Sequence, residues 1–382
     1  MNRTVLIIIV LLVLVGGGWL LFNNNSAAPD TTVPTGPIKV GVLGPYTGDA
    51  AVYGEPLHNT IQLAIDEINA QGGVGGRQLE PIYEDGKCDS ATAVSATHKL
   101  IDVDHVQLII GGFCSGETIP SVPVAAQAKV VMLSPSASSP DLTGISPYFF
   151  RDYPSDAKQG EVLAKLASSK GYKTVAFIQE QTDYATGLYK AFDSNFKTLG
   201  GATTNEAFPT SANDFRSIIT KIKSQKPDAV FIDTQTPQAA ERILKQMHEL
   251  GYKPQLFVSD VTMGEPATLT ANKALLEGTY GAEFVPDMTN EKLKHLVDAY
   301  KAKYQKDMPY VGYMSAAYDA VYLIKDGITQ VGENGEKLAA WSRTISGWAG
   351  ASGAVTIGQD GDRVSGHVAE IIHDGKTQVL TQ

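Results

Sequence analysis

Side chains that could bind a small ionic ligand follow three apolar runs of the sequence. Two hydroxyl-rich segments, 114–116 (CSG) and 134–138 (SPSAS), each follow such a run, and Asp260 ends a third one. Hydroxyl groups beside free backbone N–H groups suit an anion such as a carboxylate, whereas a desolvated carboxylate suits an ammonium group. An α-amino acid presents both of these groups, so the three segments together predict an amino-acid site.

A structural role is the alternative for each of these side chains taken singly. Ser115 and Ser138 could cap helices, as serines often do, and Asp260 could cap the turn that follows it. The presence of both serines together with Asp260 favours a ligand site over separate caps.

Motifs that would point to catalysis are missing from the sequence. It contains no His-Glu-x-x-His and no Gly-x-Ser-x-Gly, and the triplet 375–377 (GKT) has Glu370 where a phosphate loop needs its first glycine. The glycine-rich stretch 72–76 follows a predicted helix and precedes a predicted strand, which is the reverse of a dinucleotide loop. The seven histidines have no metal-ligand spacing. We therefore expect a binding protein without metal or cofactor, not an enzyme.

The elements that position these segments alternate between strands and helices. Apolar runs predict strands at 38–43, 79–83, 106–110, 130–133, 174–178, 229–232 and 256–258. The spacing of apolar residues predicts helices near 57–68, 91–101, 118–128, 184–199, 237–250, 290–305 and 313–331, and a short helix capped by Asp214. Two such series, followed by a strand-like tail over 353–380, predict an α/β protein with two lobes built on parallel sheets.

Composition and charge narrow the class of protein. Hydrophobic residues make up 43% and charged residues 19% of the 382 residues, which fits an ordinary globular chain and excludes a multi-span membrane protein. The net charge of −10 disfavours nucleic acid as a partner, because a surface of this sign repels phosphate groups.

The N-terminal segment predicts an extracytoplasmic protein. After Arg3, the run 5–22 is uncharged for about 18 residues, enough to cross a hydrocarbon core of about 30 Å once. The position of Arg3 leaves the N-terminus in the cytoplasm and the rest of the chain outside. We expect a retained membrane anchor over 1–22 and a flexible linker over 23–37, without a cytoplasmic output domain. Cleavage of a signal peptide near Ala28 is the alternative.

Five stretches of the chain resemble one known family. In order, they are IKVGVLGPYTGDAAVYG, AIDEINAQGGVGGRQLEPIYEDGKCD, LIIGGFCSGET, LSPSASSPDL and QTDYATGL. They resemble the type I periplasmic binding proteins that capture branched-chain amino acids for ABC transporters, and the resemblance extends from Ile38 to about Gly366. It implies two Rossmann-like lobes, 38–154 plus 284–357 and 155–283 plus 358–382. It also implies a hinge of three crossing segments that lets the lobes close on a ligand.

The resemblance also implies which residues bind the ligand. The set is Tyr53, Ser115, Ser136, Ala137, Ser138, Tyr184, Gln235 and Asp260. Ser115 and Ser138 match residues that hold the ligand's carboxylate, Asp260 matches the acidic residue that receives its ammonium group, and the two tyrosines match walls of the pocket. Ser138 replaces a common threonine, and Gln235 replaces an aromatic residue of many members. The expected ligand is therefore an amino acid, branched-chain or a related small amide.

The same resemblance pairs the sequence contexts of Cys88 and Cys114, the two cysteines of the chain. Each cysteine follows the end of a predicted strand, and an extracytoplasmic compartment permits oxidation. A disulfide in the first lobe is expected, and two free thiols are the alternative. The spacing matches no four-ligand zinc pattern.

Three classes of function compete for this sequence. A binding protein that delivers its ligand to the permease and ATPase subunits of an ABC transporter fits best, because convergent polar groups between two extracytoplasmic lobes suit capture and release. A ligand-sensing ectodomain that works with a separate signalling partner is the alternative. An enzyme is the least favoured class.

Overall fold

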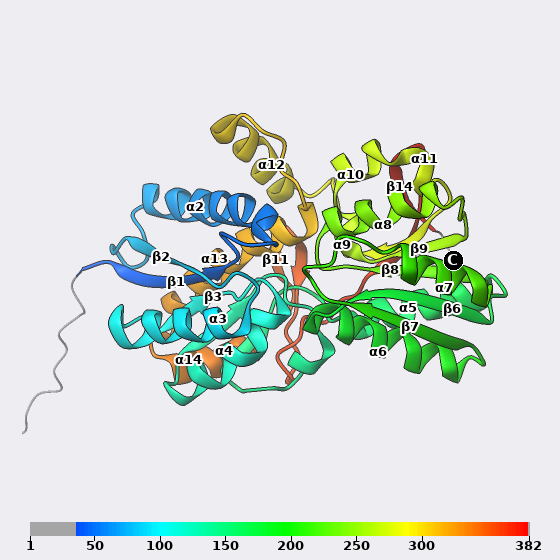
Figure 1. The fold of residues 1–382 in the computed structure, drawn as a ribbon. Coiled ribbons are helices and arrows are strands. Elements are labelled where there is room, and N and C mark those ends of the chain that lie inside the picture. The colour runs from blue at the N-terminus through cyan, green and yellow to red at the C-terminus, as the bar shows by residue number, and fades with distance from the viewer. Residues whose placement is uncertain (1–35, 381–382) are drawn as a thin grey trace, which may run out of the picture. The chain divides into compact units, whose positions relative to one another are not determined.

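The computed structural model describes residues 36–380, which form two α/β lobes (Figure 1). The first lobe is built on a five-stranded sheet and the second lobe on a seven-stranded sheet. The predicted α/β fold with two lobes is therefore confirmed.

The first lobe has a parallel sheet with the strand order β2-β1-β3-β4-β5. Its strands are β1 (Ile38–Gly44), β2 (Leu79–Asp85), β3 (Leu108–Ile110), β4 (Val131–Ser134) and β5 (Phe149–Arg151). Its helices are α2 (Gly54–Ala70), α3 (Ser90–His98), α4 (Ser115–Gln127), α12 (Glu291–Tyr304), α13 (Val311–Val331) and α14 (Gly335–Ser342). Two further strands, β11 (Trp348–Gly350) and β12 (Gly353–Val355), pair antiparallel in a separate two-stranded sheet. Helices α12 to α14 share a core with β1, so the chain returns to this lobe after building most of the other.

The second lobe has the strand order β14-β13-β10-β9-β8-β6-β7. Its strands are β6 (Thr174–Glu180), β7 (Ala202–Phe208), β8 (Ala229–Asp233), β9 (Gln255–Val258), β10 (Tyr280–Glu283), β13 (Val368–His373) and β14 (Lys376–Val379). Its helices are α5 (Asp156–Ser169), α6 (Asp183–Thr198), α7 (Arg216–Gln225), α8 (Pro237–Glu249), α9 (Asp260–Met263), α10 (Pro266–Ala271) and α11 (Lys273–Leu276). The strands β6 to β10 pair in parallel, whereas β13 and β14 pair antiparallel at one edge.

Burial on both faces explains why the central strands are apolar. In β1, Ile38, Val40 and Val42 pack into one core with α2 and α13. Leu43 of the same strand packs into a different core with α3 and α4. Alternate side chains therefore enter apolar layers on opposite faces, which is typical of a parallel sheet covered by helices.

The glycine-rich stretch after α2 is a turn. Gly73 has a φ of +74°, and a Cβ at this position would lie 2.0 Å from the carbonyl oxygen of Arg77. Only glycine fits there without displacing the backbone. The stretch therefore ends a helix, as its position in the sequence predicts.

Several elements differ from the sequence-based prediction. Strands β5, β7, β10 and β11 and helices α5, α9, α10, α11 and α14 have no predicted counterpart. The helix predicted over 91–101 is α-helical only to His98 and continues as a π-helical turn, Lys99–Val103. The prediction that Asp214 caps a short helix is wrong in detail, because Phe215 is the N-cap of α7. The Asp214 carboxylate nevertheless accepts a hydrogen bond from the Arg216 N–H at 3.1 Å.

Three segments, 152–155, 284–290 and 356–367, carry the chain between the lobes. Two of them are hydrogen-bonded to each other. Arg151 at the end of β5 donates to both carboxylate oxygens of Asp362, at 2.7 and 2.9 Å. Arg363 donates to the carbonyl oxygen of Asp152 at 2.8 Å. These contacts hold the crossing segments in a fixed register next to the cleft.

The predicted membrane anchor, 1–22, lies outside the described residues, as does nearly all of the predicted linker. Within residues 36–380, no helix combines the length and the apolar character that a membrane span needs.

Cys88 and Cys114 form a disulfide, with their Cα atoms 5.3 Å apart. The expected pairing is thus confirmed. The bond joins the loop after β2 to the residue that precedes α4.

We expect the disulfide to stabilise the fold measurably. Replacing both cysteines by alanine should lower the free energy of unfolding by about 3 kcal/mol, because the unfolded chain regains the entropy of an open loop. Urea denaturation of the two proteins gives this difference. A thiol assay on the denatured, unreduced protein should detect no free thiol, and two equivalents would contradict the pairing.

Candidate functional site

The N-terminus of α4 forms one wall of a cavity between the lobes. Ser115 is the first residue of this helix, and its Oγ accepts a hydrogen bond from the Ser139 N–H at 3.2 Å. The buried Glu117 carboxylate accepts the N–H groups of Phe113 at 2.9 Å and Cys114 at 3.1 Å. Burial raises the pKa of Glu117 to about 7. This carboxyl group therefore fixes the loop that presents Ser115.

The loop after β4 supplies further hydroxyl groups. Ser136 donates its hydroxyl to the carbonyl oxygen of Phe113 at 2.6 Å. Ser138 donates its hydroxyl to Asp156 Oδ2 at 2.6 Å. The Ala137 N–H donates to the hydroxyl oxygen of Ser134, the last residue of β4, at 2.9 Å. The other two bonds tie the loop to the segment before α4 on one side and to α5 of the second lobe on the other.

Asp260 is buried at the start of α9 in the second lobe, with 1% of its surface exposed. Its Oδ1 accepts a hydrogen bond from the Tyr184 hydroxyl at 2.5 Å. Its Oδ2 accepts hydrogen bonds from Tyr313 at 2.7 Å and Tyr153 at 3.1 Å. Burial and the charge of Asp260 raise the pKa of all three tyrosines well above the usual value, so each hydroxyl keeps the proton that it donates. The three tyrosines together form a cage around the carboxylate.

Gln235 and Tyr53 connect the two lobes at the other side of the cavity. The Tyr53 hydroxyl donates to the carbonyl oxygen of Gln235 at 3.0 Å. The Gln235 N–H donates to Glu180 at 2.7 Å, and its side-chain amide lies 3.9 Å from Cys114 Sγ. Gln235 thus contacts the first lobe through both its backbone and its side chain.

The cavity between the lobes is small and enclosed by aromatic and hydroxyl groups. Its lining residues are Tyr53, Phe113, Cys114, Ser115, Ser136, Ser138, Tyr184, Gln235, Val261 and Tyr313. Its volume of about 20 Å³ is close to what one water molecule occupies. A ligand of amino-acid size can therefore enter only when the lobes or these side chains move apart.

All predicted site residues except Ala137 and Asp260 line this cavity. Ala137 is buried behind the lining, and Asp260 lies behind the hydroxyls of Tyr184 and Tyr313. The structure thus brings the predicted residues into one region, with Asp260 separated from the open space by its tyrosine cage.

The helix-cap alternative does not fit the serines or Asp260. Cys114, not Ser115, is the N-cap of α4, and the Ser138 hydroxyl binds a carboxylate instead of a helix N–H. Ser259 is the N-cap of α9, and the Asp260 carboxylate is directed at tyrosines. Helix capping therefore does not explain why these side chains are present.

Four lining residues are absent from the predicted ligand-binding set: Phe113, Cys114, Val261 and Tyr313. The first three adjoin predicted site residues along the chain, so a wider window around each strand end would include them. Tyr313 lies at the start of α13, far along the chain, and the predicted helix over 313–331 contains no hint of its role. Tyr153, which reaches Asp260 from a crossing segment, is likewise unpredicted.

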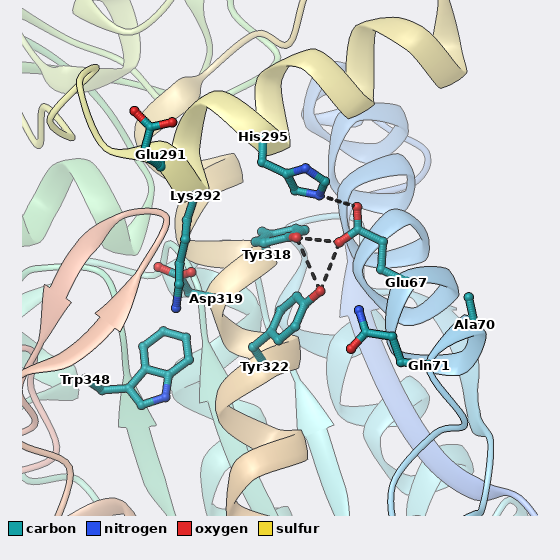
Figure 2. A pocket seen from close by; sticks show the side chains of 10 residues that line it. All are labelled: Glu67, Ala70, Gln71, Glu291, Lys292, His295, Tyr318, Asp319, Tyr322 and Trp348. Atoms are coloured by element: carbon teal, nitrogen blue, oxygen red, sulfur yellow. Dashed lines mark hydrogen bonds and ion pairs between the residues drawn. The ribbon is translucent and has the colours of Figure 1, made fainter.

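A second and larger cavity, of about 540 Å³, lies within the first lobe between α2, α12, α13 and β11 (Figure 2). Glu67 accepts hydrogen bonds from Tyr318 at 2.5 Å and Tyr322 at 2.9 Å. The Lys292 ammonium lies 5.2 Å from the ring centre of Trp348. Glu67 and Lys292 thus contact the walls of this cavity, and all of its lining belongs to one lobe. The cavity between the lobes is therefore the better candidate for the ligand site.

Comparisons with known proteins find relatives over most of the chain. A family model described as periplasmic binding protein matches residues 37–369. A Leu/Ile/Val-binding protein of Rhizobium johnstonii is 31% identical over 340 residues, which cover 86% of this chain and 89% of that protein. A leucine-, isoleucine-, valine-, threonine- and alanine-binding protein of Pseudomonas aeruginosa is 30% identical over 308 residues, which cover 79% and 81%.

Solved structures show the same two-lobed arrangement. A leucine-binding protein from Thermotoga maritima has a TM-score of 0.81 at 27% identity, covering 90% of this chain and 98% of that chain. A branched-chain amino acid transporter substrate-binding protein from Streptococcus pneumoniae, in complex with isoleucine, has a TM-score of 0.80 at 27% identity, with the same coverage of 90% and 98%. This chain therefore belongs to the family of type I periplasmic binding proteins that includes the branched-chain amino-acid binding proteins, as its sequence resemblance predicts.

Proposed function

We propose that this protein captures an amino acid between its lobes outside the cytoplasm and delivers it to the permease and ATPase subunits of an ABC transporter. The observation that carries the proposal is the cavity between the lobes, where serine hydroxyls of one lobe lie opposite the caged Asp260 of the other. The relatives are named for binding leucine, isoleucine and valine, and these names support an amino acid as the ligand.

Each end of the ligand has a separate partner in this proposal. The ligand's carboxylate binds the hydroxyl of Ser115, the backbone N–H of Ser136 and the hydroxyl of Ser138, which rotates away from Asp156 to donate its proton to the ligand. The Ser115 Oγ accepts one hydrogen bond from the protein, so its proton is available to a carboxylate oxygen. The ligand's ammonium group binds Asp260, where it replaces hydrogen bonds from the tyrosine cage. Tyr53 and Gln235 then face the ligand's side chain.

The two lobes close on the ligand by rotation about the crossing segments. We assign residues 38–154 and 284–357 to the first lobe and residues 155–283 and 358–382 to the second. The small cavity volume of about 20 Å³ supports a closing motion, because the ligand cannot pass the lining residues otherwise.

Native mass spectrometry of the chain without residues 1–36 tests the proposal. The protein should carry an amino acid from the expression host, detected as a mass difference that disappears on unfolding. A protein that neither retains an amino acid nor binds any of the twenty added in turn would contradict it.

We further propose that residues 1–22 stay attached and tether the lobes to the outer face of the cytoplasmic membrane. A flexible linker over 23–37 would keep captured ligand near the permease. We expect the protein to remain in the membrane fraction after a salt wash and to be released by detergent. N-terminal sequencing of a mature protein that begins near Ala28 would contradict the tether.

A further inference from the structure

One donor to Asp260 lies outside the cavity between the lobes. Tyr153 belongs to the crossing segment 152–155, and 1% of its surface is exposed. Its hydroxyl donates to Asp260 Oδ2 at 3.1 Å. The other two donors, Tyr184 and Tyr313, line the cavity, whereas Tyr153 does not. Tyr153 therefore reaches the carboxylate from the protein interior, where a ligand in the cavity does not compete with it directly.

The ring of Tyr153 contacts both of the other crossing segments. Its centre lies 5.5 Å from the ring centre of Phe284, which begins segment 284–290, and the ring planes meet at 80°. It lies 5.9 Å from the ring centre of His367, which ends segment 356–367, at an interplanar angle of 75°. Edge-to-face contacts of this kind are the favoured arrangement of aromatic rings. All three crossing segments thus meet at one side chain.

Arg363 joins the same three segments next to Tyr153. It donates to the carbonyl oxygen of Asp152 at 2.8 Å, and its guanidinium carbon lies 4.6 Å from the ring centre of Phe284. Arg363 and Phe284 are both buried. A guanidinium group over a buried ring attracts the ring and restricts its movement. The crossing segments, and not one lobe alone, therefore determine where Tyr153 lies.

Tyr153 also contacts both lobes. Its ring centre lies 4.9 Å from that of Tyr313, the third residue of α13 in the first lobe. Its hydroxyl reaches Asp260, the first residue of α9 in the second lobe. A single residue thus connects the two lobes, the segments between them and the carboxylate that the proposed function assigns to the ligand's ammonium group.

A purely structural role is the alternative for this residue. A buried tyrosine hydroxyl needs an acceptor, and Asp260 would then serve only to satisfy it. The capacity of the carboxylate favours a further role. Its two oxygens offer about four acceptor positions, so Tyr153 can stay bound while the ligand takes the positions of the cavity-lining tyrosines. Burial and the charge of Asp260 raise the pKa of Tyr153 well above its usual value, so its hydroxyl remains a donor.

We propose that Tyr153 is a positioning residue that couples amino-acid binding at Asp260 to the closing of the lobes. The inference rests on the proposed function and adds a regulation of its site. The ligand's ammonium group takes the place of Tyr184 or Tyr313, while the Tyr153 hydroxyl stays on Oδ2. Asp260 is then bound to the ligand and, through Tyr153, to the crossing segments about which the lobes rotate. The ligand thereby favours the closed position, in which Tyr153 reaches Asp260.

Calorimetric titration of the full chain in mild detergent with leucine tests the role of the hydroxyl. Tyr153→Phe keeps the ring contacts and removes the hydrogen bond to a charged acceptor, so leucine should bind at least about tenfold more weakly. The control Tyr304→Phe removes a hydroxyl bond of 2.9 Å to the Asn59 carbonyl oxygen within the first lobe. It should change the affinity less than about twofold. The melting temperatures of the two unliganded variants should be similar, because each keeps its ring and loses one hydrogen bond.

Pulsed electron paramagnetic resonance measures the closing itself. Spin labels are attached through Val103→Cys in the first lobe and Leu199→Cys in the second, at side chains that are 65% and 40% exposed. The two native cysteines are paired and do not react with the label. Saturating leucine should shift the distance between the labels in the parent protein. Under the same conditions, Tyr153→Phe should leave at least about tenfold more molecules at the ligand-free distance.

A double-mutant cycle tests whether Tyr153 acts through Asp260. In the Asp260→Asn protein, which lacks the charged acceptor, adding Tyr153→Phe should weaken leucine binding less than about threefold. Equilibrium dialysis with radiolabelled leucine extends this measurement to weak affinities. A further loss of about tenfold or more in this background would show that Tyr153 acts independently of Asp260, and it would overturn the proposal.

The outcomes distinguish this inference from the proposed function. A Tyr153→Phe protein that binds leucine and closes as the parent protein does would overturn the coupling and leave amino-acid capture standing. Weaker binding together with complete closing would also overturn the coupling, as would a parent protein whose label distance does not change with leucine. If neither leucine nor any other amino acid binds to the parent protein, both proposals fail.

Discussion

Replacing Arg151 by methionine is expected to lower the free energy of unfolding by about 3–5 kcal/mol, because it leaves a partly buried carboxylate without its counter-charge. The Arg151 side chain has no exposed surface, and its partner Asp362 is 14% exposed. The guanidinium also donates to the carbonyl oxygens of Ala137 at 3.1 Å and Ser139 at 2.9 Å. The substitution would leave both of these carbonyl oxygens buried without this donor.

Urea denaturation followed by circular dichroism measures this loss. A matched control is Arg216→Met, since Arg216 is 50% exposed and forms ion pairs with Asp214 and Glu249 on the surface. Exposed ion pairs contribute about 1 kcal/mol or less, so the control should change stability little. Equal losses in the free energy of unfolding for the two substitutions would show that the buried pair of Arg151 and Asp362 stabilises the fold no more than an exposed ion pair does.

The second large effect is expected at Asp260. Asp260→Asn should weaken binding of an α-amino acid by at least about tenfold, and a loss of about 2–5 kcal/mol is typical when one partner of a buried charged contact is removed. Asparagine keeps the shape of the side chain and one oxygen acceptor for the tyrosine hydroxyls. The melting temperature of the unliganded protein should therefore change much less than with Arg151→Met.

Calorimetric titration measures the affinity, and the second cavity provides the control. Tyr322→Phe removes a hydrogen bond to Glu67 in the cavity of the first lobe shown in Figure 2. It should leave amino-acid affinity unchanged. A large loss of amino-acid affinity with Tyr322→Phe and no loss with Asp260→Asn would show that the ligand binds in the cavity of the first lobe instead.

The central strands can be predicted from sequence because both of their faces are buried. Every residue of β8 (AVFID) is buried, and most of them form a continuous apolar run. The edge strand β7 (ATTNEAF) is only partly buried along most of its length. It therefore contains polar residues and lacks the apolar run that predicts a strand. Strand β5 has three residues, too few to show any period. Exposure and length thus decide which strands the pattern reveals.

The site is predictable only where it follows the strand ends. Asp260 lies two residues after the end of β9 and Ser115 five residues after the end of β3, and parallel strands present their carboxyl ends to the ligand crevice. Tyr153 and Tyr313 reach Asp260 from 107 and 53 residues away along the chain. Their convergence depends on where the crossing segments return between the lobes, which no local pattern encodes.

The central claim is that the cleft recognises both ends of an α-amino acid, and derivatives blocked at one end test it most directly. The protein is titrated with its best-binding free amino acid, with the N-acetyl derivative and with the carboxamide. Each blocked form should bind at least about 100-fold more weakly, corresponding to about 2.7 kcal/mol, because Asp260 or the serine hydroxyls lose their charged partner. An N-acetyl derivative that binds as tightly as the free amino acid would contradict the account.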